Sequence, residues 1–251
     1  MVTGIRLREP ALNVNVHDNL IRNCGQGILT ERGQATVGER ALNPKNRVFR
    51  VQTPVDDRTF LRAESPSGLP LERARPWQCS GWSLAWQSGS KPKTVSIIDS
   101  FDPDTLRFKL REPHEMKPGD RFEVIAPSVN WNIHDNTIRS CLKPVVLDSY
   151  GSETSFFKDN IITRGETTGV KAAVEVHGRF NLIGNHISGF DEKDSSALAL
   201  YPDALGRVSR NLYRDNIFER CANMVAESQK GLWGASAKES NLTVDSDEEK
   251  K

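Results

Sequence analysis

Four short apolar runs in this chain of 251 residues each end in an acidic residue. The runs are GILTE, VVLD, AAVE and MVAE, and their acids are Glu31, Asp148, Glu175 and Glu227. Because alternate residues of a strand face opposite sides, these acids point outward if the apolar residues point inward. Glycosidic cleavage requires a carboxylic acid with a raised pKa beside an ionised carboxylate. The pattern therefore predicts a carbohydrate-active site.

Other polar residues occupy matching places in the same runs. Tyr201 stands where the acids stand, with Arg8 at the N-terminal end of this column, and Tyr150, His177 and Asp203 follow two residues further along. We predict that the catalytic residues are Asp148, Glu175 and Glu31, with Asp148 and Glu175 as the central pair. We predict that the substrate-binding residues are Arg8, Tyr150, His177, Tyr201, Asp203 and Glu227.

Such a column of acids is unfavourable for stability alone. Like charges on adjacent strands destabilise a sheet by up to about 1 kcal/mol, so we expect at least one carboxyl pKa to be raised. Residues on adjacent coils would lie about 5 Å apart, near the separation in retaining enzymes, and those two coils apart about 9.6 Å, near the separation in inverting ones; of the two we expect inversion. The alternative is a solvated face whose acids bind Lys, Arg or water.

A repeated block must carry these runs. It reads NVHDNLIRNC at 15–24, NIHDNTIRSC at 132–141, FFKDNIITRG at 156–165, LIGNHISGF at 182–190 and LYRDNIFERC at 212–221. A period near 24 residues is too short for two helices and is typical of a solenoid of brief parallel strands. The shared Asn column, whose amides can hydrogen-bond from coil to coil, is Asn19, Asn136, Asn160, Asn185 and Asn216. The sequence predicts an all-β protein, a parallel β-helix of about five to six coils.

A long insertion separates the first two blocks. Residues 34–128 hold ten of the thirteen prolines and three of the five tryptophans, which are Trp77, Trp82 and Trp86. Alternating runs divided by turn signals predict a small antiparallel β-barrel or sandwich with these tryptophans in its core, and a sugar-stacking surface is the alternative. We therefore predict a β-helix over 1–33 and 129–234, an inserted barrel over 34–128, and a disordered polar tail over 235–251.

The remaining cysteines and histidines predict no metal site. Cys24, Cys141 and Cys221 share one column of the repeat, where we expect reduced, inward-facing side chains. No zinc-ligand spacing is present. His17 and His134 each precede an Asp in a turn, which we expect to be solvated.

Composition limits the classes of partner. With 34 basic and 33 acidic residues, the net charge of +1 argues against nucleic-acid binding. No apolar run approaches the roughly 18 residues that cross a membrane, and the first residues show no secretory signal, so the compartment stays open. No capping element precedes residue 4, and we expect self-association through this uncapped N-terminal coil.

The Asn-x-[Ile/Val]-x-x-Asn-x-Ile-x-x-Cys frame over residues 4–33 and 130–231 resembles the right-handed parallel β-helices of the pectin-lyase-like superfamily. That resemblance implies a right-handed solenoid, substrate along the outer face of one strand stack, and a secreted or periplasmic protein. The insertion, with SFDPDTLRFKL and KPGDRFEV within 100–124, resembles the barrel of bacterial α-1,3-galactosidases. This second resemblance implies inverting hydrolysis of terminal galactose by Asp and Glu residues.

Three functional hypotheses follow. The first is an inverting glycoside hydrolase of α-galactosidase type that acts on an oligo- or polysaccharide without a cofactor. The second is a polysaccharide lyase whose acids hold Ca²⁺, which prefers several oxygen ligands, while a Lys or Arg removes the proton. The third is a glycan-binding or structural β-helix module without catalytic activity.

Overall fold

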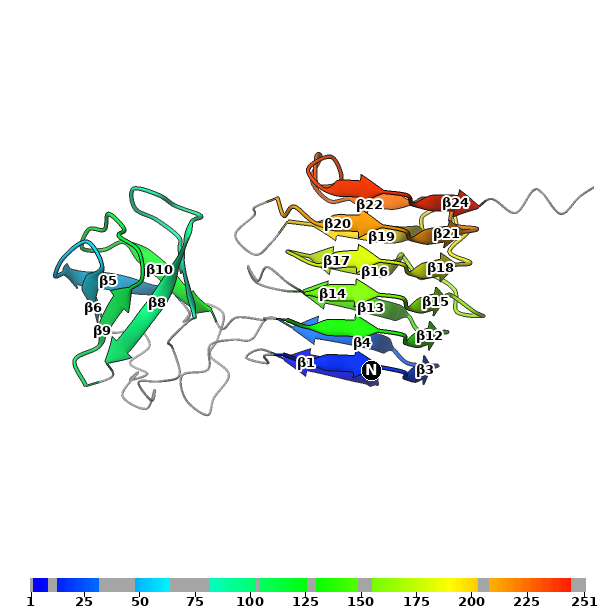
Figure 1. The fold of residues 1–251 in the computed structure, drawn as a ribbon, viewed down its shortest axis with the longest axis horizontal. Helices are drawn as coiled ribbons and strands as arrows, with labels where there is room; N and C mark the ends of the chain where they lie inside the picture. The colour runs from blue at the N-terminus through cyan, green and yellow to red at the C-terminus, as the bar shows by residue number, and fades with distance from the viewer. Residues whose placement is uncertain are drawn as a thin grey trace, which may run out of the picture. The chain divides into compact units, whose positions relative to one another are not determined.

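The computed structural model describes residues 2–8, 13–31, 48–63, 82–102, 104–125, 130–148, 155–202 and 208–244. Every regular element within these ranges is a β-strand, which confirms the all-β prediction (Figure 1). The chain divides into two compact units, one of Met1–Arg32 with Ser128–Lys251 and one of Gly33–Pro127. None of the described segments is a helix of the length and apolar character needed to span a membrane.

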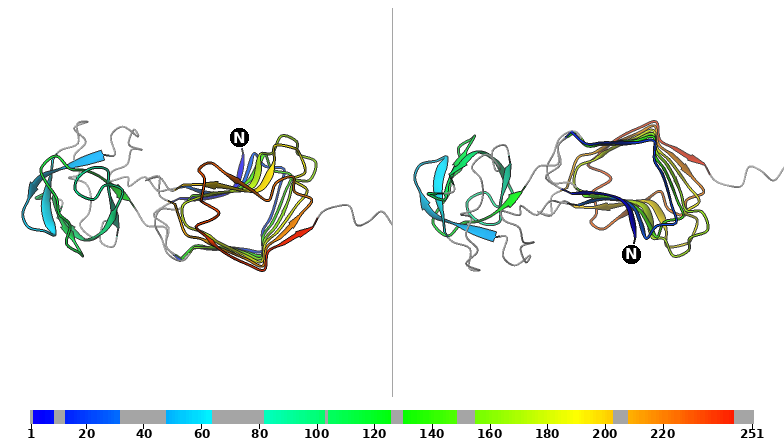
Figure 2. Two further views of the ribbon diagram at one scale, coloured as in Figure 1. Left: turned by 90° about the horizontal axis from the view of Figure 1, so that it is seen from above. Right: turned by 90° about the horizontal axis from the view of Figure 1, so that it is seen from below.

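The larger unit is a parallel β-solenoid built from three six-stranded sheets, whose coils superpose when seen end-on (Figure 2). The first sheet contains β1 (Thr3–Arg8), β4 (Gln26–Glu31), β13 (Lys143–Asp148), β16 (Ala172–His177), β19 (Ser196–Tyr201) and β22 (Val225–Glu227). The second contains β2 (Asn15–His17), β11 (Asn132–His134), β14 (Phe156–Lys158), β17 (Asn181–Ile183), β20 (Leu212–Arg214) and β23 (Ala237–Glu239). The third contains β3 (Leu20–Arg22), β12 (Thr137–Arg139), β15 (Ile161–Thr163), β18 (His186–Ser188), β21 (Ile217–Glu219) and β24 (Leu242–Val244).

An asparagine ladder joins the coils at the bend between the second and third sheets. The side-chain Nδ2 of each Asn donates to Oδ1 of the Asn in the next coil over 2.9–3.0 Å, from Asn19 through to Asn241. The residue before each ladder Asn in the first three coils has a left-handed backbone, at φ 56° for Asp18, 53° for Asp135 and 53° for Asp159. Asp tolerates this conformation better than most residues, which explains its place in the repeat. The expected bonding of stacked Asn amides is confirmed.

Apolar side chains from all three sheets fill the interior of the solenoid. Ile28, Val145, Val174 and Leu198 form one inward column of the first sheet, and they belong to a single buried cluster. Cys141 is buried and the other two predicted cysteines, Cys24 and Cys221, are partly buried; all three are free thiols, as expected. Burial raises the pKa of the Cys221 thiol to about 11, so this cysteine packs as a small apolar group.

The C-terminal coil corrects the predicted tail. Residues 235–251 were expected to be disordered from their polarity, yet they contain β23 and β24, while residues 245–251 lie outside the described residues. The backbone N–H and Nδ2 of Asn216 both donate to Oδ1 of Asn241, so the ladder holds this polar segment in place. The preceding turns, around the buried Leu232, pack onto the last coil, where Trp233 lies 4.9 Å from the Tyr213 ring.

The smaller unit is a closed antiparallel barrel, as predicted for the insertion. Its strands are β5 (Val48–Pro54), β6 (Thr59–Ala63), β7 (Ser83–Trp86), β8 (Val95–Asp102), β9 (Arg107–Leu110) and β10 (Arg121–Ile125), in the order β10-β5-β6-β9-β8-β7. Trp86 is buried among Phe60, Phe108 and Phe122, and its Nε1 donates to the Ser96 hydroxyl at 2.9 Å. The prediction of a core role is thus confirmed for Trp86. Trp82 packs against the same cluster, and Trp77 lies outside the described residues.

Candidate functional site

Five polar residues gather on the outer face of the first sheet, on three consecutive strands. They are Lys143 and Asp148 of β13, Glu175 and His177 of β16, and Tyr201 of β19. We refer to this group as the outer patch. Asp148, Glu175, His177 and Tyr201 face outward because their alternate neighbours, such as Leu147, Val176 and Leu200, are buried in the core. Lys143 is exposed because it begins β13, although it shares the column of the buried Val145.

The register of the first sheet corrects the predicted acid column. Asp148 pairs with His177, and His177 pairs with Tyr201, whereas Glu175 pairs with Val146 and Ala199. The prediction that Glu175 lies directly beside Asp148 is wrong by two residues. A shift of two preserves the alternation of apolar and polar residues, so the pattern AAVEVH fits either register. In the structure Val174 and Val176 lie in the buried core column, and Ala172 and Ala173 are buried at the start of β16.

Glu227 is displaced from the predicted column for a different reason. It pairs with Leu200 rather than with Tyr201, and its side-chain Oε1 accepts a hydrogen bond from the Trp233 backbone N–H. The chain turns back over the last coil at this point, and Glu227 holds that turn. Its hydrogen bond to Trp233 gives it a structural contact, and its role as a substrate-binding residue stays a prediction.

Of four other predicted site residues, the structure describes the backbone of two and leaves the other two outside the described residues. The backbones of Arg8 and Glu31 pair across β1 and β4, in the columns expected for them, but their side chains lie outside the described residues. Tyr150 and Asp203 lie wholly outside the described residues. Their roles at the site stay predictions.

Glu175 is a largely buried carboxylate of the outer patch, with 18% of its side chain exposed. Its Oε2 lies 3.8 Å from Nε2 of His177, and its Oε1 lies 3.6 Å from Nζ of Lys143. The neighbouring His177 ring has the largest effect on this carboxyl and lowers its pKa; burial opposes the change, and Lys143 lowers the pKa further. The expected rise in a carboxyl pKa is thus wrong for Glu175, because its nearest charged neighbours are bases rather than a second acid.

His177 and Tyr201 stack on each other along their column. Their ring centroids are 4.2 Å apart and their planes differ by 3°. Each ring covers one face of the other, and the polar edges of both rings stay available to a ligand. The stack also limits the rotamers of both residues before a ligand arrives.

The backbone of Asp148 is fixed by a buried hydroxyl. Thr30 Oγ1 accepts a hydrogen bond from the Asp148 N–H at 2.6 Å and donates to the Asp148 carbonyl at 3.1 Å. Thr30 is fully buried, as its expected inward position requires. This contact joins β4 to β13 near the point where the chain leaves the solenoid for the barrel.

The corrected register also changes the expected separation of the two central carboxylates. Asp148 and Glu175 are diagonal neighbours, one strand and two residues apart. With strands about 4.8 Å apart and a rise of about 3.3 Å per residue, their Cα atoms lie about 8 Å apart. The range of about 6.5–9.5 Å typical of inverting glycosidases refers to the carboxyl groups themselves, whose separation also depends on the two side-chain rotamers.

Lys143 is the member of the outer patch that sequence reasoning missed. It begins the run KPVVLD, outside the apolar alternation that identified the acids. Its contact with Glu175 crosses from one coil to the next, so only the register between coils reveals it. No local pattern in the sequence marks this residue.

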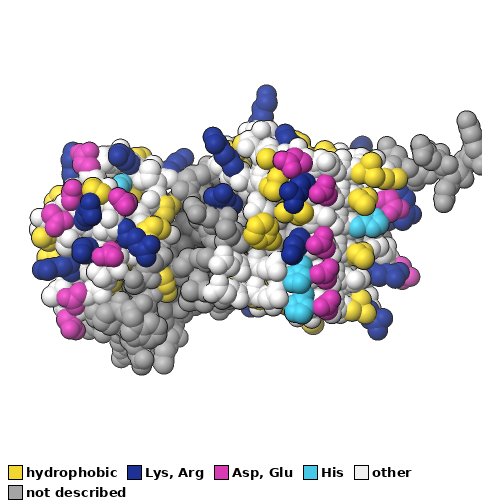
Figure 3. Space-filling model, viewed as in Figure 1, with side chains coloured by type: hydrophobic (Ala, Val, Ile, Leu, Met, Phe, Trp, Pro, Cys, Tyr) yellow, Lys and Arg dark blue, Asp and Glu magenta, His cyan; other side chains and the backbone are white. Residues whose placement is uncertain are grey.

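His17 and His134, expected in solvated turns, form a second polar group on the second sheet. Their rings stack 5.1 Å apart, and each ring Nδ1 lies within hydrogen-bond distance of the following Asp carboxylate. Figure 3 shows the histidines and acids as adjacent columns on one face. Among the described residues, no group of three or more His, Cys, Asp or Glu is arranged to hold a metal ion.

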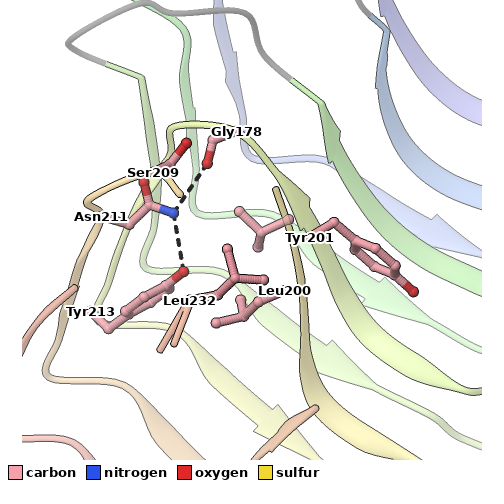
Figure 4. Close-up of a pocket in the computed structure, with 8 residues that line it drawn as sticks. Gly178, Leu200, Tyr201, Ser209, Asn211, Tyr213 and Leu232 are labelled. Carbon is pink, nitrogen blue, oxygen red and sulfur yellow. Dashed lines mark hydrogen bonds between the residues drawn. The ribbon is translucent and has the colours of Figure 1, made fainter. Parts of the chain in front are cut away.

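A small cavity lies beneath the backbone of Tyr201. Its volume is about 10 Å³, room for a single water, and its lining includes Leu200, Asn211, Tyr213 and Leu232 (Figure 4). Asn211 Nδ2 donates to the Tyr213 hydroxyl at 3.1 Å, and burial raises the pKa of Tyr213 to about 12. The Tyr201 side chain points away from this cavity. The outer patch therefore lies on the surface and does not open into this cavity.

The barrel carries a wider depression of about 380 Å³ on its own surface. Its lining is Thr59, Ser100, Phe101, Asp102, Arg107 and Lys109. The Asp102 carboxylate is occupied by the adjacent turn, because it accepts hydrogen bonds from the Thr105 hydroxyl at 2.5 Å and the Asp104 N–H at 3.0 Å. The charged lining of this depression is Asp102, Arg107 and Lys109, so its acid is engaged by the barrel's own backbone and hydroxyl groups.

No protein-family model matches this chain, and a search of curated proteins finds no match. The parallel β-solenoid is established by the strand pairing itself. The resemblances to the pectin-lyase-like superfamily and to α-1,3-galactosidases stay predictions.

Proposed function

We propose that the outer patch binds a carbohydrate. The observation that supports this proposal is the meeting of an ionised carboxylate, an ammonium group, an imidazole edge and a phenol edge on adjacent coils. A sugar hydroxyl both donates and accepts hydrogen bonds. Glu175 supplies an acceptor, Lys143 supplies donors, and Tyr201 supplies either. The open face suits an extended chain better than a small molecule, which normally requires a concave pocket.

A second candidate function is inverting hydrolysis of a glycoside on the same face, as in the predicted α-galactosidase type. Two observations favour it: the diagonal placement of Asp148 and Glu175, and the lowered pKa of Glu175. An ionised Glu175 serves as the base that activates water, and Asp148 is then the acid that protonates the leaving oxygen.

Binding is tested by titration calorimetry with oligosaccharides selected on a glycan array. We expect Glu175→Gln and Tyr201→Phe each to weaken binding about tenfold or more, because each change removes a hydrogen bond to a ligand hydroxyl. Glu219→Gln is the matched control, since Glu219 also pairs with a histidine, His186 at 2.8 Å, but on the third sheet. Equal affinity in all variants would remove the outer patch as the binding site.

Hydrolysis is tested separately with terminal α-galactosides. We expect Asp148→Asn and Glu175→Gln each to abolish turnover, and proton NMR of the unsubstituted protein to show release of the inverted anomer. Unchanged turnover in both variants contradicts this second function. Binding without turnover in the unsubstituted protein leaves a glycan-binding module.

A further inference from the structure

Large apolar side chains form one column on the outer face of the third sheet. Strand pairing places its six members in register: Leu20, Thr137, Ile161, His186, Ile217 and Leu242. The four aliphatic residues are 38–66% exposed. We refer to these six residues as the apolar column; Figure 3 shows apolar side chains aligned in this way and interrupted by a histidine. A row of exposed aliphatics, here interrupted by Thr137 and His186, is a candidate interaction surface.

The neighbouring outward column of the same sheet carries charges of opposite sign at its two ends. In coil order it contains Arg22, Arg139, Thr163, Ser188, Glu219 and Val244. Basic residues occupy β3 and β12, hydroxyl residues occupy β15 and β18, and an acid occupies β21. We refer to these six residues as the charged column.

Reversing the order of the six strands brings several residues of the two columns into complementary pairs, while Arg22 then faces Val244 and Ile161 faces His186. Reversing the six strands places β12 opposite β21, so Arg139 faces Glu219, and it places β15 opposite β18, so Thr163 faces Ser188, of which 7% is exposed. In the apolar column the same reversal sets Leu20 against Leu242. This relationship is what an isologous two-fold interface requires, because each contact then occurs twice.

We propose that the third sheet is a homodimer interface, in which two copies pack face to face about a two-fold axis parallel to the strands. Sheets packed in this way lie about 10 Å apart, a distance that side chains of this size fill. Within one chain Arg139 and Glu219 cannot meet, because three strand spacings separate β12 from β21, about 14 Å. Within its own chain Glu219 contacts His186 at 2.8 Å and Arg220 at 3.5 Å, so a pair with Arg139 of a second copy adds to these contacts and forms only between copies.

The dimensions of the face set the strength of the contact. Six strands span about 24 Å and three residues span about 10 Å, which is small beside the roughly 800 Å² per partner of a standard stable interface. The dimer is therefore weak and depends on protein concentration. Two Arg139–Glu219 pairs specify the orientation of the two copies, and the signs of these charges can be exchanged by substitution.

Sedimentation velocity of the full chain over a range of concentrations tests the proposal. We expect the unsubstituted protein to shift from monomer to dimer as concentration rises. Arg139→Glu or Glu219→Arg alone should weaken the dimer about tenfold or more, because each sets like charges opposite each other at two places. The double variant, and an equimolar mixture of the two single variants, should regain the dimer.

The mixture distinguishes this interface from a folding defect in either variant. Recovery requires that residue 139 of one copy meet residue 219 of the other, which no misfolding of either variant can produce. Arg50→Glu, the same charge change at an exposed site on the barrel, is the control and should dimerise normally. A monomer at every concentration overturns the proposal, as does a dimer that neither single variant weakens or that the mixture fails to restore. A dimer built through the N-terminal coil would be insensitive to all of these variants.

Discussion

Asp148 pairs with His177 across β13 and β16, and Glu175 is therefore its diagonal neighbour. This arrangement keeps two carboxylates from direct contact and sets a base next to Glu175. The electrostatic penalty expected from stacked acids is thereby avoided. The carboxyl groups of the described residues whose pKa clearly departs from its ordinary value, Asp56, Asp102 and Glu175, are all lowered.

The pairing of Glu175 predicts a specific dependence of stability on pH. Its folded-state pKa lies below the ordinary value of 4.5, so the carboxylate contributes stability above that pH and loses the contribution as pH falls through the folded pKa. We expect the free energy of unfolding to fall more steeply below pH 4.5 in the unsubstituted protein than in Glu175→Gln. Urea unfolding at several pH values down to about 3 measures this difference.

A suitable control is Glu112→Gln, which removes an exposed carboxylate from the barrel. Its curve should run parallel to that of the unsubstituted protein. If the pH dependence of the unfolding free energy of Glu175→Gln also runs parallel to that of the unsubstituted protein, the contacts of Glu175 with His177 and Lys143 contribute no net stability.

Thr30 is expected to position Asp148 through its hydroxyl. Thr30→Val keeps the volume but leaves the Asp148 N–H and carbonyl without their partner, so we expect a loss of about 2 kcal/mol in the free energy of unfolding. Thr30→Ser retains the hydroxyl and should cost less. The amide chemical shift of Asp148 should move in the Val variant and stay close to its original value in the Ser variant. Equal stability of Val and Ser variants would show that the hydroxyl is not needed.

The buried part of the asparagine ladder predicts a large and donor-specific effect. Asn160 is fully buried, and its Nδ2 donates to the Ile133 and Lys158 carbonyls and to Asn185 Oδ1. Asn160→Asp preserves the shape of the side chain but replaces the Nδ2 donor with an oxygen. This oxygen has no hydrogen to donate to the three acceptors that it faces. We therefore expect both Asn160→Asp and Asn160→Ala to lose about 3 kcal/mol or more in thermal or urea unfolding.

Asn19 provides the comparison for this ladder test, since it lies at the partly exposed first coil and makes fewer described contacts. Asn19→Ala should cost about 1 kcal/mol or less. If Asn160→Asp proved as stable as the unsubstituted protein, the amide donors of the ladder would be dispensable.

Much of the fold was predictable because the repeat shows the solenoid period directly. Asn136, Asn160 and Asn185 recur at nearly constant spacing, and a residue that must bond its copy in the next coil cannot drift in register. The last coil was missed because it keeps Asn241 at the right distance but puts Thr243 where earlier coils have Ile or Phe. A search for the Asn spacing alone would have found it.

The site was less predictable because it depends on register between coils. Outward residues such as Glu175 and Tyr201 follow no spacing rule of their own, and loops of different length precede each strand of the first sheet. The apolar alternation indicates which face a residue takes but not which neighbour it meets. The ion pair of Lys143 with Glu175 is therefore a property of the folded stack and not of either run.

The closure of the last coil gives a final prediction. Leu232 is almost fully buried within the solenoid core, although it lies in a turn-rich segment that polarity alone marks as exposed. Leu232→Ala should reduce the free energy of unfolding by about 2–4 kcal/mol, because it leaves a cavity against Tyr213 and Leu200. Leu142→Ala removes the same atoms at a half-exposed position and should cost about 0.5 kcal/mol or less.

Hydrogen exchange should show faster opening of β20 and β22 in Leu232→Ala, while β12 and β13 keep their protection, because neighbouring coils of a solenoid stabilise one another locally. Uniform loss of protection along the solenoid would show instead that this turn supports the whole stack.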